Sequence, residues 1–338
     1  MRVLKSVLRN NKEEIAAIER EIAGRRQIMG KPIVVFGSFV VDLTSRSKGL
    51  PVPGQTILGS SFKLGPGGKG SNQAVAAHRA GADVTLVTKV GKDVFASVAL
   101  DFYRGEGMKT EYILQDPDLT TGAAVIMVDE VSAQNEIVVV SGACGCITDA
   151  DVEKCRELIE GASILLLQHE INFDAQYKVI DIAHKAGVKI VLNPAPAVEV
   201  PEDVLKKIDV VTPNETEAQV LTGVEVKTQA DAEKAAKVFL EKGVKNVVIT
   251  MGALGAFATD GKKSELLPRL NVNAIDTTGA GDAFNGGFVM ALSEGKDLFE
   301  ALRYGNVTGA LSVTKLGTAP SMPMRSEIDA FMKESYGI

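Results

Sequence analysis

The sequence has no tryptophan, only three cysteines and no long apolar run. Cys144, Cys146 and Cys155 are an odd number without the spacing of a disulfide framework, and no histidine or further cysteine stands beside the C-x-C pair to complete a zinc site. We therefore expect buried, reduced thiols. No apolar stretch reaches the roughly 20 residues that span a bilayer, and the first residues lack the apolar core of a signal peptide. These absences predict a cytoplasmic protein that does not bind membranes.

A strong charge of one sign is also absent. The 37 basic and 43 acidic residues give a net charge of −6, so no basic surface for nucleic acid is expected. Small molecules are the expected partners. What the chain does have is ordinary apolar content, 45% of 338 residues, which suits one large α/β unit or two domains.

Residues 1–30 differ in composition from the rest of the chain. They are charged and free of proline, and their apolar residues recur at helical spacing: Leu4, Leu8, Ile15, Ile18 and Ile22. A DNA-binding helix-turn-helix needs more helices than fit before Pro32. We expect an N-terminal helical extension that docks on the body or on a partner subunit and carries no chemistry.

From residue 32 onwards, short β-branched runs alternate with helical stretches. The runs are IVVFGS, VTLVTKVG, SILLLQHE, KIVLNPAP, VVTPNE and NVVITMG, and they are typical of buried parallel strands. The pattern predicts an α/β fold over residues 31–338, with a doubly wound, mostly parallel sheet flanked by helices. Ligands bind such sheets outside the carboxyl ends of the strands. The polar residues that end these runs should therefore face one crevice: Glu170, Asn193, Asn214, Glu215, Glu217 and Gly252.

Two segments, about 43–66 and 119–141, break this alternation. Their residues alternate between apolar and polar and are punctuated by turn residues, which predicts hairpins rather than βαβ units. We expect them to form a small β-sheet lid over the crevice.

Glycine is concentrated in the stretch GPGGKGSNQAVAAHRAG, residues 65–81. Its G-x-G-x-x-G spacing matches a dinucleotide-binding turn, but the context does not, because the next run, VTLVTKVGKD, ends without a well-placed acid. The stretch offers bare backbone at Gly68, a cation at Lys69 and an amide at Asn72. These groups suit hydroxyls that approach the backbone closely; a tight turn packed under a helix is the alternative.

A second glycine cluster, DTTGAGDAFNGGF, begins at residue 276 and puts Asp282 at the start of an expected helix. A helix N-terminus carries about half a positive charge and free N–H groups, so Asp282 could simply be the anion favoured there. In phosphoryl transfer, the N–H groups of Gly279, Ala280 and Gly281 would stabilise the transferred group while Asp282 takes the hydroxyl proton. The two glycine clusters together favour this second interpretation.

GGKGSNQA and DTTGAGDAFNGGF closely resemble the two signature segments of the ribokinase family of sugar kinases, also called PfkB-type. LNPAPA, TPNETEAQVLTG and TMGALGA are similar to further family segments in the same order, and the resemblance runs from about Val34 to Phe331. It implies an α/β sandwich whose lid forms a homodimer interface, and ATP, Mg²⁺ and activating K⁺ as cofactors. The reaction it implies is phosphorylation of the terminal hydroxyl of a pentose, D-ribose first, with 2-deoxyribose as the alternative. A non-catalytic sugar sensor would most simply have lost the base or the glycine turn, and both are retained.

The resemblance also assigns roles, although simple structural use stays open for each residue. Asp282 would be the catalytic base, with Gly279, Ala280 and Gly281 as the anion hole. The sugar contacts would be Asp42, Gly68, Lys69, Asn72, Glu170 and Asp282. The nucleotide contacts would be Asn214, Glu217, Thr250, Gly252, Gly255, Gly281 and Asn306, with Mg²⁺ reached through water near Glu217. The potassium site would use carbonyls and side chains at Asp276, Thr278, Ser312, Lys315, Gly317 and Ser321.

Two positions depart from the family pattern. Val40 stands where ribokinases usually carry Asn, two residues before Asp42, and SGACGCIT, residues 141–148, lacks an Asn that many relatives carry there. Both changes remove a polar side chain near the sugar or the lid. They affect the identity of the sugar and leave the phosphoryl-transfer residues untouched.

Overall fold

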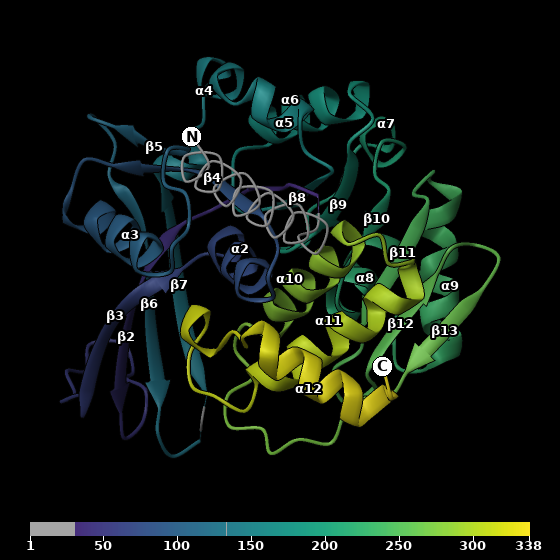
Figure 1. Cartoon of the computed structure of the whole chain (residues 1–338). Helices are drawn as coiled ribbons and strands as arrows, with labels where there is room; N and C mark the ends of the chain where they lie inside the picture. Colours follow the sequence, from purple (N-terminus) through teal and green to yellow (C-terminus); the bar gives the residue numbers. More distant parts are fainter. Residues whose placement is uncertain (1–30, 133) are drawn as a thin grey trace, which may run out of the picture.

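The computed structural model describes residues 31–132 and 134–338, and the helical extension expected for residues 1–30 lies outside them. The described chain forms a large sheet with helices on both faces and a second, smaller sheet beside it (Figure 1). Two apolar clusters, one on each face of the large sheet, make up most of the core. The predicted α/β class and doubly wound sheet are confirmed.

The large sheet has nine strands in the order β13-β12-β11-β10-β9-β8-β1-β4-β5. Strand neighbours from β5 to β11 run parallel, whereas β12 and β13 are antiparallel additions at one edge. All six β-branched runs that were predicted to be parallel strands lie in this sheet. The strands are β1 (Ile33–Phe36), β4 (Val84–Gly91), β5 (Ile113–Asp116), β8 (Ile164–Gln168), β9 (Lys189–Asn193), β10 (Val210–Val211), β11 (Asn246–Thr250), β12 (Ala256–Thr259) and β13 (Ser264–Leu267).

Helices cover both faces because each presents an apolar side to the sheet. On one face lie α2 (Lys69–Arg79), α3 (Val94–Gly105), α10 (Ala280–Ser293), α11 (Leu298–Ser312) and α12 (Arg325–Tyr336). On the other lie α4 (Asp149–Lys154), α5 (Arg156–Glu160), α6 (Phe173–Lys185), α7 (Glu202–Leu205), α8 (Glu215–Thr222) and α9 (Gln229–Glu241). The helical stretch DADVEKCRELIEGA, residues 149–162, forms two short helices rather than one, because the Cys155 N–H bonds to the Val152 carbonyl three residues back.

Helices α2 and α10 touch so closely that glycine is required between them. A Cβ added at Gly286 would lie 2.3 Å from the Cβ of Ala76, well inside van der Waals contact. Almost every residue of α10 is buried. This packing holds the two glycine clusters of the sequence side by side, because each cluster begins one of the two helices.

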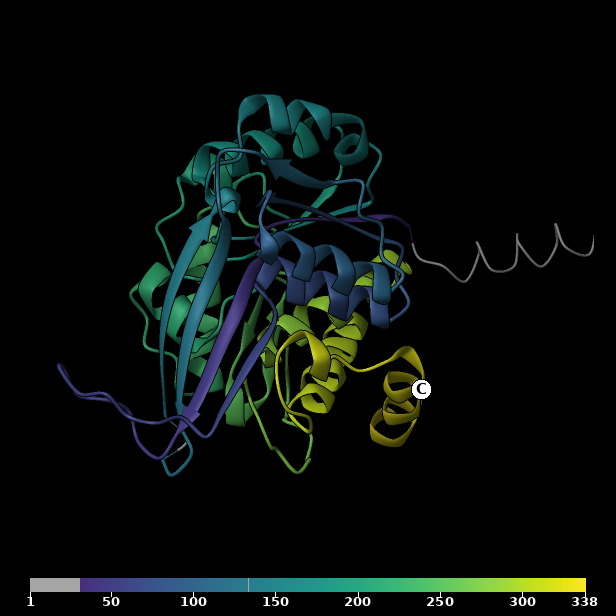
Figure 2. The ribbon, with the colours of Figure 1, turned by 90° about the vertical axis from the view of Figure 1, so that its left-hand side faces the viewer.

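The second sheet has the strand order β3-β2-β6-β7. Its strands are β2 (Val40–Ser47), β3 (Ser61–Gly67), β6 (Thr121–Asp129) and β7 (Asn135–Gly142). Strand β2 pairs antiparallel with β3 and β6 with β7, so both expected hairpins are present, and β2 and β6 join them in parallel. Figure 2 shows the long strands of this sheet running away from the helical body. Its action as a lid stays a prediction.

The three cysteines are free thiols, and the expectation of burial holds for two of them. Cys144 and Cys155 are buried, but Cys146 is exposed, because it follows the short 3-10 helix η1 (Ala143–Gly145) at the surface. None of the helices described here is both long and apolar enough to cross a membrane.

Candidate active site

A polar cleft of about 160 Å³ opens where the carboxyl ends of β9, β10 and β11 meet the start of α10. Of the six residues expected to face one crevice, three line it: Asn193, Asn214 and Glu217. The other three do not: Glu170 lies at the first glycine turn, and Glu215 and Gly252 lie beside each other. The walls of the cleft comprise Lys69, Asn193, Ala195, Thr212, Asn214, Glu217, Thr250, Thr277, Gly279, Ala280, Gly281, Asp282 and Asn285. The cleft therefore lies at the position where doubly wound sheets bind ligands.

The N-terminus of α10 faces this cleft without a side-chain cap. Gly279 takes a left-handed conformation, with φ of 79°, which a residue with a Cβ rarely adopts. Gly279, Ala280 and Gly281 are all part of the cleft wall. An uncapped helix start with a positive dipole end is a site for an anion such as a phosphate.

The carboxylate of Asp282 is buried directly behind this helix start, with 6% of the residue exposed. Its Oδ2 accepts a hydrogen bond from Asn72 Nδ2 at 3.0 Å, and its Oδ1 accepts one from Gln73 Nε2 at 2.9 Å. Neutral amide donors orient a carboxylate without neutralising it. Asn72 Oδ1 is buried and has no partner among the described residues, so it is available to a hydroxyl group.

Glu170 holds the first glycine turn against β1. Its Oε2 accepts the hydroxyl of Ser38 at 2.5 Å and the backbone N–H of Lys69 at 2.8 Å. Gly68, the residue before Lys69, has a φ of 90° and packs on the backbone of Ser38. The Asp282 carboxylate, and more weakly Glu170 and Glu217, raises the pKa of Lys69 against the opposing effect of burial, so its ammonium lies among the acids of the site.

Asp42 lies on β2, and burial and then the nearby Glu170 carboxylate raise its pKa to about 6. A Cβ at Gly67 on the neighbouring strand β3 would lie 2.0 Å from Asp42 Oδ1, which explains why this position is glycine. The Glu170 carboxylate therefore lies close enough to Asp42 to disfavour its ionised form.

Asn214 and Glu217 form a capping box at the start of α8. The side chain of each accepts the backbone N–H of the other, at 2.8 and 2.9 Å. Burial raises the pKa of Glu217, and the neighbouring Lys69 opposes this. Thr250 lines the cleft and is bridged to Asn214.

Gly255 and Asn306 lie outside the cleft. A Cβ at Gly255 would lie 2.0 Å from the Leu267 carbonyl oxygen, so this glycine is required by packing. Asn306 on α11 donates its side-chain amide to the Pro268 carbonyl and to the Tyr336 hydroxyl, each at 3.0 Å. In this structure both residues support the segments at the edge of β12 and β13.

The expected potassium residues come from two loops that meet at Asp276. Its carboxylate accepts the N–H groups of Thr278 at 2.9 Å and Gly317 at 3.0 Å. Burial opposes ionisation of Asp276, but the hydrogen bonds from Thr278 and Gly317 outweigh it and lower its pKa.

The side chains of Ser312, Lys315 and Ser321 have internal partners instead. The serine hydroxyls donate to carbonyls of their own segments, and Lys315 pairs with Glu327 at 2.7 Å. Backbone carbonyls are thus left as the main oxygen ligands that these loops could offer a cation.

Several residues of the site were not predicted from the sequence. Gln73 and Gln168 are buried behind Asp282, with Gln168 Nε2 donating to Gln73 Oε1 at 2.7 Å. In the cleft wall, Thr212 donates to Asn285 Oδ1 at 2.7 Å, and Asn285 donates to the Gly281 carbonyl at 2.9 Å. The sequence feature that could have identified Gln73 and Asn285 is an amide side chain within a run of small and apolar residues, SNQAVAA and DAFNGGF.

The two departures from the family pattern meet in space. Val40 and Cys144 pack with Ala124 in a small buried cluster of their own. Val40 lies two residues before Asp42 on β2, so both side chains point to the same face of the second sheet. Cys144 lies against the Glu170 backbone, with Sγ 3.9 Å from its carbonyl oxygen.

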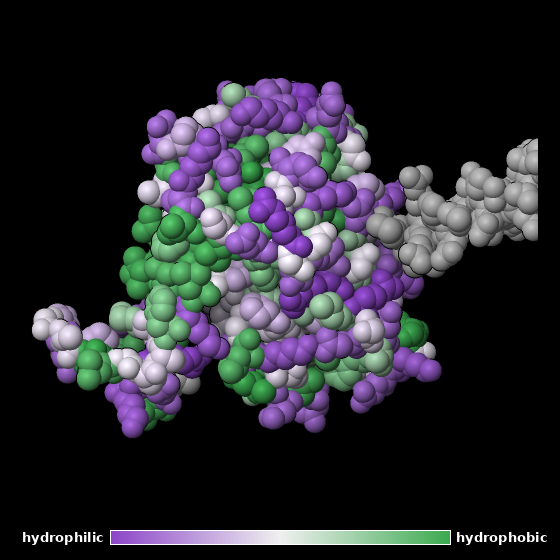
Figure 3. Space-filling model, turned by 60° about the vertical axis from the view of Figure 1, so that its left-hand side comes forward, coloured by the Kyte–Doolittle hydropathy of each residue, from purple (hydrophilic) through white to green (hydrophobic). Residues whose placement is uncertain are grey.

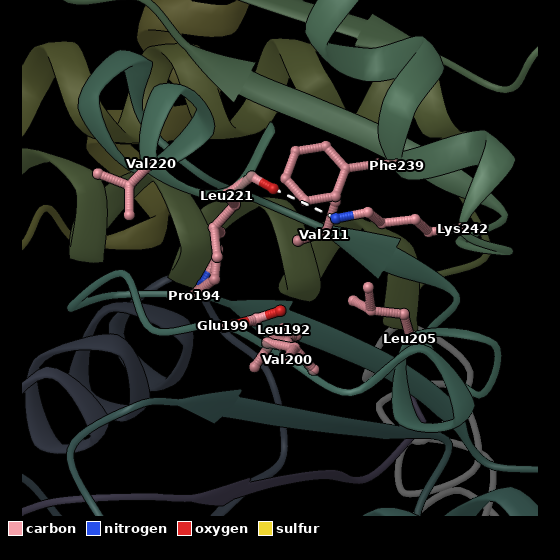
Figure 4. Close-up of a pocket in the computed structure, with 10 residues that line it drawn as sticks. All are labelled: Leu192, Pro194, Glu199, Val200, Leu205, Val211, Val220, Leu221, Phe239 and Lys242. Atoms are coloured by element: carbon pink, nitrogen blue, oxygen red, sulfur yellow. Dashed lines mark hydrogen bonds between the residues drawn. The ribbon is translucent and has the colours of Figure 1, made fainter. Parts of the chain in front are cut away.

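A second cavity, of about 340 Å³, lies behind α8 (Figure 4). It is mainly apolar, lined by Leu192, Pro194, Glu199, Val200, Leu205, Val211, Val220, Leu221, Phe239 and Lys242. Lys242 Nζ donates to the Leu221 carbonyl at 3.4 Å across it. This cavity is larger than the polar cleft, but neither the uncapped start of α10 nor Asp282 lines it, so we place the chemistry in the polar cleft.

The doubly wound sheet, the uncapped helix start and the buried aspartate behind it together define a phosphotransferase that acts on an alcohol group. Sequence comparison agrees with this class of enzyme and identifies the family within it. The sequence model of the pfkB family carbohydrate kinases matches residues 31–325, and the chain belongs to this family.

Among proteins of known activity, the chain is similar to ribokinase of Haemophilus influenzae, with 42% identity over 307 residues that cover 91% of this chain and all of that protein. It is also similar to deoxyribokinase of Salmonella typhi, with 35% identity over 89% of this chain and 98% of that one. Among solved structures, Arabidopsis thaliana ribokinase complexed with ribose and ATP has a TM-score of 0.83 and 31% identity, covering 90% of this chain and 99% of that one.

Proposed function

We propose that the protein transfers the γ-phosphoryl group of ATP to the terminal hydroxyl of a pentose, with D-ribose as the first candidate. The observation that carries the proposal is the buried Asp282 carboxylate beside the uncapped N-terminus of α10. The similar ribokinases, one of them complexed with ribose and ATP, support the same substrates. The similarity to deoxyribokinase makes 2-deoxyribose the second candidate.

In this mechanism Asp282 takes the proton of the sugar hydroxyl while the hydroxyl oxygen bonds to the γ-phosphorus. The bond from that phosphorus to the β,γ-bridging oxygen breaks, and ADP leaves. The N–H groups at Gly279, Ala280 and Gly281 stabilise the charge on the transferred group. Asp42, Gly68, Lys69, Asn72 and Glu170 hold the other sugar hydroxyls.

The residues present fit a magnesium-bound nucleotide. No group of three His, Cys, Asp or Glu side chains forms a metal cage within residues 31–132 and 134–338. Mg²⁺ usually keeps several waters and binds one or two carboxylates with substrate phosphates, and Glu217 in the cleft wall provides such a carboxylate. When bound, the ion neutralises phosphate charge. Asn214, Thr250, Gly252, Gly255 and Asn306 are the proposed nucleotide contacts.

The reaction is tested by following ADP release in the purified protein with Mg-ATP and ribose, 2-deoxyribose, fructose, allulose or a nucleoside. We expect turnover with a pentose. Binding of radiolabelled ribose without turnover in Mg-ATP would instead identify a sugar sensor.

Sugar affinity should depend on pH through Asp42. Its pKa of about 6 means that the carboxyl is ionised above that pH and takes up a proton below it. A protonated carboxyl is a poorer acceptor for sugar hydroxyls, so the Kd for ribose should be constant above about pH 7 and rise up to roughly tenfold per unit below about pH 6. Titration calorimetry without nucleotide measures this. In Asp42→Asn this dependence should vanish; if it persists there, another group is responsible.

We also propose potassium activation, supported by the meeting of the Asp276 and Gly317 loops next to the start of α10. An ion held by the carbonyls of these loops would order the anion-binding turn without touching substrate. Replacing K⁺ by tetramethylammonium at fixed ionic strength should therefore lower kcat severalfold, with little change in the KM for ribose. Equal rates in the two salts would refute the site.

The second sheet is proposed to close over the sugar and to form a homodimer interface. Its edge strand β7 exposes Ile137, Val138, Val139 and Val140, each at 49–64% of the residue surface. Figure 3 shows a hydrophobic area on the side of the molecule where this sheet lies. Exposed apolar area on an unpaired strand edge favours association. Sedimentation equilibrium should give twice the mass of the chain, and Val139→Lys should give the monomer mass.

Because the proposed reaction consumes ATP, we place the protein in the cytoplasm.

A further inference from the structure

Gln73 is a fully buried residue of α2 that does not line the cleft. Its Nε2 donates to Asp282 Oδ1 and to Asn193 Oδ1, both at 2.9 Å. Its Oε1 accepts the side-chain amide of Gln168 at 2.7 Å. A primary amide has two N–H groups and one carbonyl oxygen. Every hydrogen-bonding group of Gln73 is therefore used to join α2 to α10, β9 and β8.

The direction of each hydrogen bond is fixed by the two ends of this chain of amides. A carboxylate and a backbone carbonyl accept only, so Gln73 must turn its nitrogen to Asp282, and Asn193 must turn its nitrogen to the Thr212 carbonyl, which it meets at 2.8 Å. Asn193 then presents its oxygen to Gln73. The two requirements agree, so only one arrangement satisfies the side-chain amides of Gln73 and Asn193, even though the shape of an amide does not distinguish nitrogen from oxygen.

We infer that Gln73 is a positioning residue for the proposed phosphoryl transfer, one that fixes the orientation of the Asp282 carboxylate. With Asn72 on Oδ2 and Gln73 on Oδ1, two consecutive residues of α2 hold both carboxylate oxygens. A general base must lie within hydrogen-bond reach of the proton it takes, and a displacement of about 1 Å can cost about 100-fold in rate.

Gln168 extends this control to the sugar end of the site. It is the last residue of β8, two residues before Glu170, which holds the glycine turn. These hydrogen-bonded amides therefore connect the Asp282 carboxylate to the end of β8, which is followed by the proposed sugar contact Glu170. The inference rests on the proposed role of Asp282.

The test is Gln73→Met, which keeps the length of the side chain and removes both donors. We expect kcat to fall roughly 10- to 100-fold, while the KM values for ribose and ATP stay within about threefold, because Gln73 does not line the cleft. Gln176→Met is the matched control: Gln176 is also fully buried, and neither its side-chain nitrogen nor its oxygen has a partner in the described structure. This control should keep the kcat of the parent protein.

A double-mutant cycle separates positioning from general damage. If Gln73 acts through the Asp282 carboxylate, Gln73→Met should have little further effect on kcat in an Asp282→Asn background. An equal loss in both backgrounds, or a parent-like kcat for Gln73→Met alone, would overturn the inference. If Asp282→Asn itself retains the parent kcat, the proposed function fails instead. Should Gln73→Met not fold, Gln73→Asn withdraws the nitrogen from Asp282 by one methylene and reports the same quantity.

Discussion

Replacing Asp282 by asparagine is expected to lower kcat by roughly 10²- to 10⁴-fold, the usual contribution of a positioned general base. The amide cannot accept the proton of the sugar hydroxyl, whereas the donors at Gly279, Ala280 and Gly281 remain in place. Steady-state kinetics with ribose and Mg-ATP measure the loss. Ribose binding by calorimetry should change far less than kcat, because the other proposed sugar contacts are untouched.

The structure adds a condition to this experiment. Both oxygens of Asp282 accept amide N–H groups from α2, and asparagine has only one oxygen, so one donor of Asn72 or Gln73 is left facing another N–H group. A buried unpaired donor costs about 1–3 kcal/mol. The Tm of Asp282→Asn should therefore be lower than the Tm of the parent protein. The kinetics should be measured at a temperature well below this Tm. A kcat within a few-fold of the parent value would contradict the role of Asp282 as the catalytic base. Asp282 would then serve only as an anion that stabilises the N-terminus of α10.

The sequence was sufficient for the parts of this site that depend on local pattern. The uncapped glycine turn at the start of α10 and the capping box of Asn214 and Glu217 follow from residue types at short spacing. The β-branched runs likewise predicted six of the seven parallel strands and missed β5 (Ile113–Asp116) at the edge of the sheet. The break at Cys155 and the exposure of Cys146 were not anticipated, and both depend on how a short segment packs.

The amide chain behind Asp282 could not be predicted in this way. Gln73 meets Gln168, Asn193 and Asp282 across sequence separations of 95, 120 and 209 residues. The small-residue run around Gln73 indicates at most that it is buried, and its partners are decided by α10 packing against α2. Gly255 and Asn306 stay proposed nucleotide contacts on the resemblance alone, and the structure adds local contacts for both that the sequence did not predict.

The meeting of Val40 and Cys144 is a further result that the sequence did not provide. Val40 and the segment SGACGCIT were separate departures from the family pattern, and the fold brings Val40 and Cys144 of that segment into one apolar cluster beside Glu170 and on the Asp42 face of β2. Burial raises the pKa of the Cys144 thiol to about 12, so the thiol stays neutral and adds no charge. A buried apolar cluster therefore lies beside two of the proposed sugar contacts, Asp42 and Glu170, and we propose that it forms an apolar wall of the sugar site.

This wall should make the enzyme tolerant of 2-deoxyribose. A site built to pair a hydroxyl rejects the deoxy analogue strongly, because its own polar group is left unpaired, whereas an apolar wall discriminates by only about 1–3 kcal/mol, roughly 10- to 200-fold. We therefore expect kcat/KM for ribose to exceed that for 2-deoxyribose by no more than about 200-fold. Competition between the two sugars under one set of conditions measures this ratio.

Val40→Asn should raise that ratio by at least about tenfold, because it restores an amide that pairs with a ribose hydroxyl and is left unpaired by 2-deoxyribose. Val40→Ala is the matched control: it removes the same apolar contacts with Ala124 and Cys144 without adding a polar group, and it should leave the ratio unchanged. If the parent already rejects 2-deoxyribose several thousand-fold, or if the asparagine and alanine variants give the same ratio, Val40 serves packing alone. Discrimination between the two sugars would then depend on the remaining polar contacts, of which Asn72, with its unpaired buried oxygen, is the next to test.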